Sequence, residues 1–295
     1  MNKYLIFRTD RIGDFLLSLI LIKSIKRNDP NSNVTIVCSE SNCEYIKSFA
    51  IVDNVKILKK GFFNKIRTFF SLKKQTYYSI IIHDLKNRSK LMSFFLKSKN
   101  KYYPNDKNII SHIDEIKKIL INLGFSFIDN DLNTLDERKK VQFYNNNEKY
   151  ILLHFDEKWI HNKYISNYVN IEPSEEELSQ FLVNLSKKVK MKIIITSGKK
   201  TPKILKNVLN GELGQKIKLI ENLSFEYLEA IIINSKILIS CHGAVSHVAA
   251  AKKISQIDII DSSYNYDIWS AHFRNYRFLN RDKFSNLSKN IINLL

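Results

Sequence analysis

The chain has 295 residues, of which 44% are hydrophobic, and its 47 lysines and arginines against 29 acidic residues give a formal net charge of +18. A chain of this length and hydrophobicity can bury two cores of ordinary size, so we expect two domains rather than one. The three cysteines lack the C-x-x-C spacing of a zinc site, and their odd number is typical of reduced thiols in a cytoplasm.

The first apolar segment is too short to be a membrane span. It covers residues 15–22, with four charged residues in the seven positions before it and Lys23 after it. A secretory signal or a transmembrane helix needs different flanks or a longer apolar run. We predict instead a buried strand at residues 4–7, a glycine-containing turn and an amphipathic helix at 15–27.

The alternation of strand and helix continues through both halves of the chain, which implies parallel sheets. Further strands of the first half are predicted at residues 34–38, 55–58 and 79–83, with helices at 62–74, 91–96 and 113–123. Strands of the second half are predicted at residues 150–155, 192–196, 217–220, 237–240 and 256–260. Helices are expected after Ser174, which has capping-box spacing to Glu177, after Ser224, and at 286–295.

A polar segment without clear periodicity, residues 125–149, separates the two series, as a connection between domains would. We place the boundary near Asn146, which gives a first domain of residues 1–146 and a second of residues 147–295. The acidic D-N-D run at 129–131 does not follow a predicted strand, so we expect it to be a solvated loop.

Two carboxylates, Asp10 and Asp14, follow the first strand, where open α/β sheets bind ligands. Gly13 lets the backbone turn closely there. A partly desolvated carboxylate at this place can act as a general base toward an attacking hydroxyl. The alternative is helix capping, and for Asp10 we favour a cap or a pairing with Arg11.

The stretch S-C-H-G-A-V-S-H-V-A-A-A follows the strand at 237–240 and starts a small-residue helix. The start of such a helix presents free amides and a partial positive charge, which suit a diphosphate. Gly243 and Ala244 leave room for an anion at the backbone, and His242 and His247 are hydrogen-bond donors for phosphate or sugar.

Lys158 follows the strand at 150–155, in the equivalent place for neutralising a departing diphosphate. On its own, such a lysine is more often a solvated surface charge. The chain contains no phosphate-binding P-loop, no G-x-G-x-x-G and no G-x-S-x-G, so the sequence disfavours a nucleotide triphosphatase, a dehydrogenase and a serine hydrolase.

The R-T-D-R-I-G-D-F-L-L segment resembles the start of glycosyltransferase family 9 proteins, the lipopolysaccharide heptosyltransferase family, and the stretch at residues 240–251 resembles their second-lobe signature. The resemblance extends to I-I-H-D-L at 81–85, Lys158-Trp159 and N-L-S-F-E at 222–226, and so covers nearly the whole chain.

This resemblance implies a GT-B fold, with two Rossmann-like, doubly wound α/β lobes facing a central cleft. The first lobe would be the acceptor side and the second would bind the nucleotide sugar, with the last helix a candidate for packing back on the first lobe. Asp14 matches the family's catalytic base and Lys158 its phosphate-binding lysine. The implied donor-binding residues are Lys158, Leu223, His242, Gly243, Ala244, Ser246 and His247, with Asp10, Arg11 and Gly13 in support.

The implied reaction is an inverting transfer of a sugar, heptose by analogy, from a nucleotide diphosphate donor to a lipopolysaccharide core or related surface glycan. It needs no metal ion and no cofactor. The resemblance implies a cytoplasmic enzyme with an anionic glycolipid or glycan acceptor and no nucleic acid partner. For a chain of this charge we also expect salt-sensitive, peripheral contact with the cytoplasmic face of the membrane.

One position departs from the family pattern, D-T-G-x-x-H, because His242 stands where the aspartate is expected. ADP-heptose is therefore the leading donor by analogy only, and a relative that uses another nucleotide sugar for polysaccharide synthesis is nearly as well supported. An inactive sugar-binding relative is a further alternative. A basic nucleic-acid-binding protein is suggested by the charge alone, but the lysines read as scattered along the chain rather than gathered in one stripe.

Overall fold

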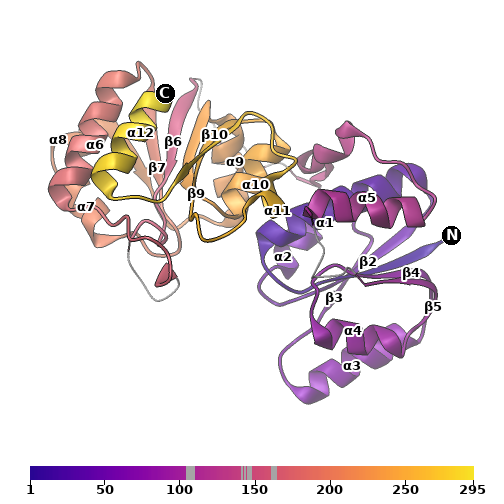
Figure 1. Ribbon diagram of the computed structural model, residues 1–295. Coiled ribbons are helices and arrows are strands. Elements are labelled where there is room, and N and C mark those ends of the chain that lie inside the picture. The colour runs from indigo at the N-terminus through magenta and orange to yellow at the C-terminus, as the bar shows by residue number, and fades with distance from the viewer. Residues whose placement is uncertain (104–109, 141, 143, 145–147, 161–164) are drawn as a thin grey trace. The chain divides into compact units, whose positions relative to one another are not determined.

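The computed structural model describes residues 1–103, 110–140, 142, 144, 148–160 and 165–295. The chain divides into two compact units, each with its own parallel sheet and apolar core (Figure 1). The first unit comprises Met1–Val141 and Asp267–His272, and the second comprises Gln142–Tyr266 and Phe273–Leu295. The boundary predicted near Asn146 lies outside the described residues.

The first unit is built on a five-stranded parallel sheet. Its strands are β1 (Lys3–Arg8), β2 (Asn33–Cys38), β3 (Asn54–Ile57), β4 (Thr76–Ile82) and β5 (Lys97–Tyr102). They pair in the order β3-β2-β1-β4-β5, and β1 is central because its residues 4–7 are apolar on both faces and fully buried. Strand β5, K-S-K-N-K-Y, was not predicted, because its polar composition is that of a solvated edge.

Helices cover both faces of this sheet. α1 (Ile12–Asn28) and α5 (His112–Asn122) pack together on one face, while α3 (Phe62–Lys73) and α4 (Asn87–Phe94) lie on the other (Figure 1). The short α2 (Cys43–Lys47) connects β2 to β3. α1 buries residues on nearly every side, because the sheet lies on one side of it and other helices on the other.

The polar segment after α5 is tied to α1. Two 3-10 helices, η2 (Asp129–Leu132) and η3 (Thr134–Glu137), pack against α1. Asp131 is fully buried and accepts hydrogen bonds from Arg27 Nε and Nη2, both at 3.0 Å, and from Ser24 Oγ at 2.7 Å. The prediction of a solvated loop is therefore wrong for Asp131, because these donors offset the cost of burying its carboxylate.

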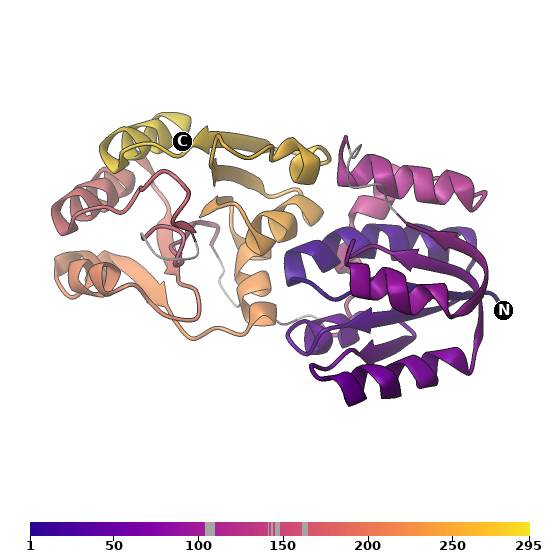
Figure 2. The ribbon, with the colours of Figure 1, turned by 60° about the horizontal axis from the view of Figure 1, so that its bottom comes forward.

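The second unit is built on a six-stranded parallel sheet (Figure 2). Its strands are β6 (Tyr150–His154), β7 (Lys192–Thr196), β8 (Ile217–Ile220), β9 (Ile237–Cys241), β10 (Ser255–Ile260) and β11 (Tyr276–Asn280). They pair in the order β11-β10-β9-β6-β7-β8. The first five were predicted. The edge strand β11 was not, because its sequence Y-R-F-L-N has no continuous buried face.

The helices of this unit are α6 (Glu175–Lys188), α7 (Lys203–Leu209), α8 (Glu212–Lys216), α9 (Phe225–Asn234), α10 (Ala244–Ala251) and α12 (Phe284–Leu294). The predicted capping box is present: Ser174 Oγ accepts from Glu177 N–H at 3.1 Å, and Glu177 Oε2 accepts from Ser174 N–H at 2.9 Å.

The last helix, α12, belongs to the second unit, as predicted for the chain from residue 147 on. It lies against α6 in the core of the second unit, with the rings of Phe284 and Phe181 5.7 Å apart, because its apolar face matches that of α6. The late segment grouped with the first unit is the one that contains the short α11 (Asp267–Ser270). No helix in the described part of the chain has both the length and the apolar character needed to cross a bilayer.

Candidate functional site

The strand order places a topological switch point in each sheet. In open α/β sheets, ligands bind outside the carboxyl ends of the two strands between which the order reverses. These strands are β1 and β4 in the first unit and β6 and β9 in the second. The residues that follow these four strands are therefore the candidate site residues of each unit.

Lys158 follows β6 and reaches across to the residue after β9. Its Nζ donates a hydrogen bond to the main-chain oxygen of His242 at 2.9 Å and lies 3.2 Å from Asp156 Oδ2. Gly243 permits this approach, because a Cβ at that position would lie 2.5 Å from Nζ. The Lys158 side chain is 17% exposed, so a shielded but reachable cation stands beside the start of α10.

Buried contacts fix the turn that carries Lys158. Trp159 is fully buried, stacks on Phe155 with ring centroids 5.0 Å apart, and donates from Nε1 to the main-chain oxygen of His154 at 2.9 Å. Arg281, which follows β11, donates from Nη2 to the main-chain oxygen of Lys158 at 2.9 Å. The backbone on both sides of Lys158 is thus held in place.

His242 is paired with a carboxylate that the sequence analysis did not single out. Its Nδ1 lies 2.5 Å from Oδ2 of Asp258, a fully buried residue of β10. Asp258 also accepts hydrogen bonds from Ser246 Oγ at 2.8 Å and from the Tyr276 hydroxyl at 3.3 Å. Because a carboxylate accepts hydrogen bonds, Nδ1 carries the proton, and Nε2 is the ring nitrogen directed away from Asp258.

Aromatic rings frame His242. The ring of Tyr266 lies 4.7 Å from it in a T-shaped contact, that of His247 lies at 5.7 Å, and that of Phe273 stacks nearly parallel at 6.2 Å. Only 10% of the His242 side chain is exposed. The imidazole therefore has a fixed orientation.

Ser246 is buried beneath the loop rather than placed at its surface. Its hydroxyl oxygen accepts from the Gly243 N–H at 3.2 Å, and the hydroxyl donates to Asp258. The side chain is completely buried. Ser246 therefore holds the start of α10 in place.

The remaining residues of the predicted donor set lie at differing positions. Ala244 is the first residue of α10 and is half-buried. His247 is buried and its ring lies 5.2 Å from that of Phe273. Leu223 lies in the connection between β8 and α9, and β8 is separated from β6 by β7. Leu223 precedes α9, which packs against α10.

In the first unit, Asp14 lies in the first turn of α1. Its Oδ2 accepts from the main-chain N–H of Arg11 at 3.1 Å, and Arg11 is the N-cap residue of the helix. Gly13 is buried in the same turn. The Asp14 side chain is half-buried. One of its carboxylate oxygens caps the helix, and the side chain remains partly accessible to solvent.

Asp10 neither caps α1 nor pairs with Arg11, so that expectation is wrong. Its Oδ2 lies 3.1 Å from Nη1 of Arg8, because the guanidinium of Arg8 is buried at the end of β1 and requires a counter-charge. Burial raises the pKa of Asp10. The Arg8 guanidinium opposes that effect, and the carboxylates of Asp14 and Asp84 add to it.

Buried polar groups continue from Arg8 toward the end of β4. Arg8 Nε donates to Ser18 Oγ at 2.6 Å, and Ser18 Oγ lies 2.7 Å from His83 Nδ1. Burial lowers the pKa of His83 well below its usual range, so its ring is neutral. Arg8 Nη2, Asp10 Oδ1 and His83 Nε2 have no hydrogen-bond partner within the described residues. Such buried atoms are rare in folded proteins, and here they mark the switch point of the first unit.

Sequence analysis missed Asp156, Asp258, Arg281 and Arg8 as site residues. A usable signal existed for two of them. Asp258 is a charged residue flanked by the isoleucines of the segment I-D-I-I, and Arg8 follows the four buried apolar residues 4–7. A charge in a buried strand requires a partner, so such a residue marks a polar cluster.

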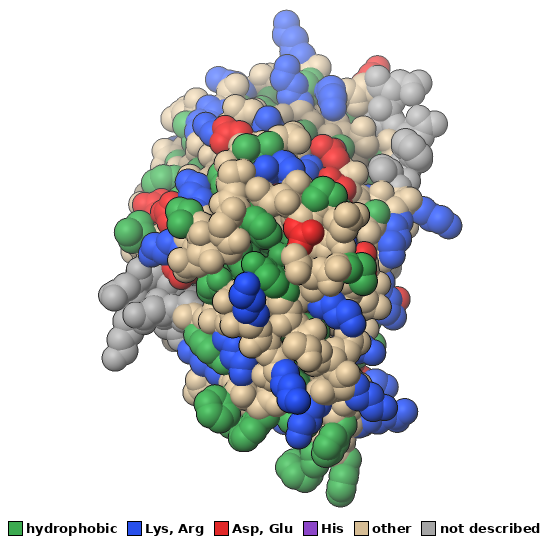
Figure 3. Space-filling view, turned by 90° about the vertical axis from the view of Figure 1, so that its right-hand side faces the viewer, with side chains coloured by type: hydrophobic (Ala, Val, Ile, Leu, Met, Phe, Trp, Pro, Cys, Tyr) green, Lys and Arg blue, Asp and Glu red, His purple; other side chains and the backbone are tan. Residues whose placement is uncertain are grey.

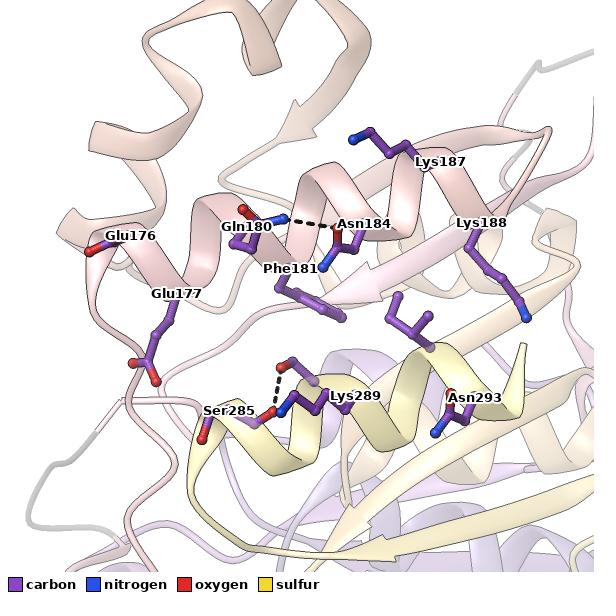
Figure 4. Close-up of a pocket in the computed structure, with 12 residues that line it drawn as sticks. Glu176, Glu177, Gln180, Phe181, Asn184, Lys187, Lys188, Ser285, Lys289 and Asn293 are labelled. Carbon is purple, nitrogen blue, oxygen red and sulfur yellow. Dashed lines mark hydrogen bonds between the residues drawn. The ribbon is translucent and has the colours of Figure 1, made fainter.

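A separate groove runs between α6 and α12 (Figure 4). Its volume is about 790 Å³, and its lining includes Glu177, Lys188 and Lys289 but none of the candidate site residues. Within the described part of the chain, no group of three or more His, Cys, Asp or Glu side chains is placed to hold a metal ion.

No protein-family model and no curated protein matches this sequence. The fold is similar to that of E. coli heptosyltransferase WaaC with ADP, with a TM-score of 0.71 and 13% identity over 99% of both chains. It is also similar to the glycosyl transferase family 9 protein from Veillonella parvula DSM 2008, with a TM-score of 0.71 and 12% identity over 98% of this chain and 89% of that one.

A third match is the UDP-GlcNAc 2-epimerase from Methanocaldococcus jannaschii, with a TM-score of 0.56 and 14% identity over 99% of this chain and 92% of that one. The predicted GT-B fold, with two Rossmann-like α/β units, is confirmed by these neighbours. At these identities the likeness establishes the fold alone.

Proposed function

We propose that this chain is an inverting glycosyltransferase that moves a sugar from a nucleotide diphosphate donor to a lipopolysaccharide core or related surface glycan. The observation that carries the proposal is the placement of Lys158. Its reachable ammonium group is held beside the start of α10 at the switch point of a Rossmann-like unit. One cation together with the free amides of a helix start suits a diphosphate.

At the donor end, Lys158 and the first amides of α10 stabilise the charge that develops on the departing diphosphate. Because Gly243 has no side chain, the ammonium group of Lys158 can lie beside the first amides of α10. His242 offers Nε2, the acceptor of its neutral ring, to a hydroxyl group of the sugar. The other proposed donor-binding residues are Leu223, Ala244 and His247, with Ser246 in support.

At the acceptor end, Asp14 is the proposed general base. It takes the proton of the acceptor hydroxyl while that oxygen bonds to the anomeric carbon of the sugar and the bond from this carbon to the diphosphate oxygen breaks. Attack from the opposite face inverts the configuration. Asp10, Arg11 and Gly13 shape the turn around Asp14, and the scheme requires neither a metal ion nor a cofactor.

Heptose is the proposed sugar because heptosyltransferases, among them WaaC with ADP and with ADP-2-deoxy-2-fluoro heptose, share this fold. The proposed acceptor is anionic, and the proposed place of work is the cytoplasmic face of a membrane. The net charge of +18 supports both, because each lysine or arginine near an anionic surface adds about 1 kcal/mol of attraction.

A second candidate is the same chemistry with a different nucleotide sugar, used for polysaccharide synthesis. The pairing of His242 with Asp258 favours it. A ligand at this loop meets a ring nitrogen instead of a carboxylate, because the carboxylate of Asp258 is fully buried behind the ring. With Nδ1 protonated, Nε2 accepts a single hydrogen bond where a carboxylate accepts several, so a sugar that presents one hydroxyl or amide donor at that place suits such a site.

The test is the melting temperature of the purified protein against a panel of nucleotide diphosphate sugars that includes ADP-heptose. A ligand at a hundred times its dissociation constant adds about 2.7 kcal/mol to the free energy of unfolding. We expect one sugar nucleotide to raise the melting temperature, and Lys158→Met to abolish the rise. Lys200→Met, at an exposed loop lysine, is the matched control and keeps it.

Asp14→Asn separates binding from chemistry. It should retain the ligand-induced rise and lose about 10²- to 10⁴-fold in turnover. Full activity of this variant would remove Asp14 from the mechanism. If only a nucleotide sugar other than ADP-heptose raises the melting temperature, the second candidate is selected. If no nucleotide sugar raises the melting temperature and nucleic acid does, the glycosyltransferase proposal is overturned.

A further inference from the structure

Helices α3 and α4 of the first unit present large apolar side chains to solvent. Six of these side chains are more than half exposed, from 57% for Phe70 to 83% for Phe63. We define the α3–α4 surface by these six residues, which are Phe62, Phe63, Phe70, Leu91, Phe94 and Phe95. Soluble proteins rarely expose so many large apolar side chains on neighbouring elements unless the surface has a partner.

Aromatic contacts join the two helices at this surface. The half-buried ring of Phe69 lies 5.6 Å from that of Phe70 and 6.4 Å from that of Phe95, and the rings of Phe94 and Phe95 are 5.2 Å apart. These rings therefore form one continuous patch across α3 and α4.

The core does not account for these side chains. Along α3, only Leu72 is buried, with Phe69 packed beside it against the core. A helix on a sheet normally turns its apolar stripe inward and keeps polar residues outside. In α3 the outward positions also carry phenylalanine, so a second, outer apolar face is present.

The same part of the chain holds most of the excess positive charge. Residues 54–103 contain thirteen lysines and arginines and one acidic residue, Asp84, which is buried. This concentration corrects the expectation that the lysines are scattered along the chain. Lys73 Nζ lies 5.8 Å from the centroid of the Phe69 ring, and Lys101 Nζ lies 5.9 Å from that of Phe94.

The space-filling view shows apolar side chains that project from the lower end of the first unit, with lysine and arginine side chains beside them (Figure 3). That end carries α3 and α4 in Figure 1. A projecting apolar face with a basic margin matches a bilayer, in which acyl chains lie beneath anionic headgroups.

We infer that the α3–α4 surface docks on an anionic lipid bilayer, with its phenylalanines at the boundary of the acyl chains and its lysines among the headgroups. This occupant follows from the combination of projecting rings and unbalanced positive charge. It adds apolar insertion to the electrostatic membrane contact proposed above, and it does not depend on the identity of the donor.

Insertion and charge attraction respond differently to salt. Attraction between lysines and headgroups weakens as salt is raised, while burial of phenylalanine in the interface does not. Binding to anionic vesicles should therefore fall with salt to a plateau above zero. The plateau should depend on the phenylalanines, and the salt-sensitive part should depend on the lysines.

The experiment is co-sedimentation of the full chain with phosphatidylcholine vesicles, with and without phosphatidylglycerol. Phe62→Ser with Phe63→Ser, and separately Phe94→Ser with Phe95→Ser, should each lower the partition coefficient on phosphatidylglycerol vesicles by about tenfold or more. Ile121→Ser, at a 71% exposed residue of α5 on the opposite face of the sheet, is the matched apolar control and should leave it within about twofold.

A further set of variants tests the contribution of charge. The double variant Lys73→Gln with Lys74→Gln removes two lysines, one in α3 and one at its C-cap, and the double variant Lys199→Gln with Lys200→Gln in the second unit is its control. The first pair should weaken binding only where phosphatidylglycerol is present, and the second pair should have a smaller effect. All substituted side chains are exposed, so the melting temperature of each variant should match that of the starting protein.

Equal partition of the phenylalanine variants and the starting protein would overturn the inference. The inference would also be overturned if the starting protein did not bind vesicles but did bind a single-stranded RNA, and if the phenylalanine variants lost that RNA binding. The donor-induced rise in melting temperature, measured on the same variants, keeps the two proposals apart. Failure of vesicle binding with an intact rise removes only the docking surface, and failure of the rise with intact vesicle binding removes only the proposed activity.

Discussion

Oδ2 of Asp258 lies 2.5 Å from Nδ1 of His242, so a buried carboxylate of β10 stands behind the imidazole that follows β9. In the D-T-G-x-x-H pattern that this loop resembles, the acidic side chain stands at the position of His242 itself. In this chain the carboxylate is that of Asp258 on the neighbouring strand β10, and it contacts the imidazole of His242.

The first prediction concerns this pair. In Asp258→Asn, the amide can accept or donate, so the ring loses its fixed proton position. We expect the affinity for the donor to fall by about tenfold or more, as when other orienting partners of histidine are replaced. Titration of the donor, followed by the melting temperature, measures this loss.

A double-mutant cycle supplies the control. His242→Asp alone would place two carboxylates together and lower the free energy of unfolding, whereas the same change made with Asp258→Asn should restore much of it. Additive effects of the two substitutions would show that the residues do not act as a pair.

The second prediction concerns the space in front of Lys158. Gly243→Ala would place a Cβ 2.5 Å from the present position of Nζ, and the flexible lysine would move away. Donor affinity should fall by about tenfold, with a small change in stability, because the φ angle of 172° is open to any residue. Gly211→Ala, where a Cβ meets nothing within 4 Å, is the matched control. Equal donor affinity in both variants would argue against a role for the Lys158 position.

The third prediction concerns the ion pair between the fully buried Asp131 and Arg27, whose side chain is 30% exposed. Asp131→Ala removes a fully buried carboxylate that accepts hydrogen bonds from Arg27 and Ser24, and we expect it to cost about 1.5 to 3 kcal/mol in free energy of unfolding. Asp129→Ala removes the other carboxylate of the same D-N-D run at an exposed position and should cost less than about 0.5 kcal/mol. Urea unfolding of both variants measures the difference, and equal losses would contradict the assignment.

The sequence predicted those strands and helices whose apolar residues follow a local pattern. Strands such as β1 and β9 are short and apolar because both of their faces are covered, and that composition is visible without a structure. The edge strands β5 and β11 escaped prediction because their residues are mostly polar or exposed, whereas the edge strands β3 and β8 keep enough apolar residues to be predicted.

The candidate site was predictable where it follows a strand directly, as for Lys158 and His242. It was not predictable where the partner is decided by strand pairing or by burial. Asp258 meets His242 only because β10 pairs with β9, and Asp10 turns to Arg8 because that guanidinium is buried. Such pairings depend on sheet order and burial, which one sequence does not display.

The last prediction concerns acid stability and rests on buried histidines. Burial lowers the pKa of His112, His154 and His272 to about 4, and it lowers the pKa of His83 well below its usual range. In the unfolded chain each has a pKa near 6.5, so between pH 6.5 and 4 the unfolded state binds more protons than the folded state. The free energy of unfolding should therefore fall as the pH is lowered through this window.

His154→Gln tests the contribution of one of these residues. His154 Nδ1 lies 2.9 Å from Thr196 Oγ1, a contact that a glutamine amide can replace without titrating. Between pH 7 and pH 5, a histidine whose pKa drops from 6.5 to about 4 on folding costs about 2 kcal/mol. Urea unfolding at the two pH values should show a loss smaller by that amount in the variant. An equal loss in both proteins would mean that His154 takes up its proton without opposing the folded state.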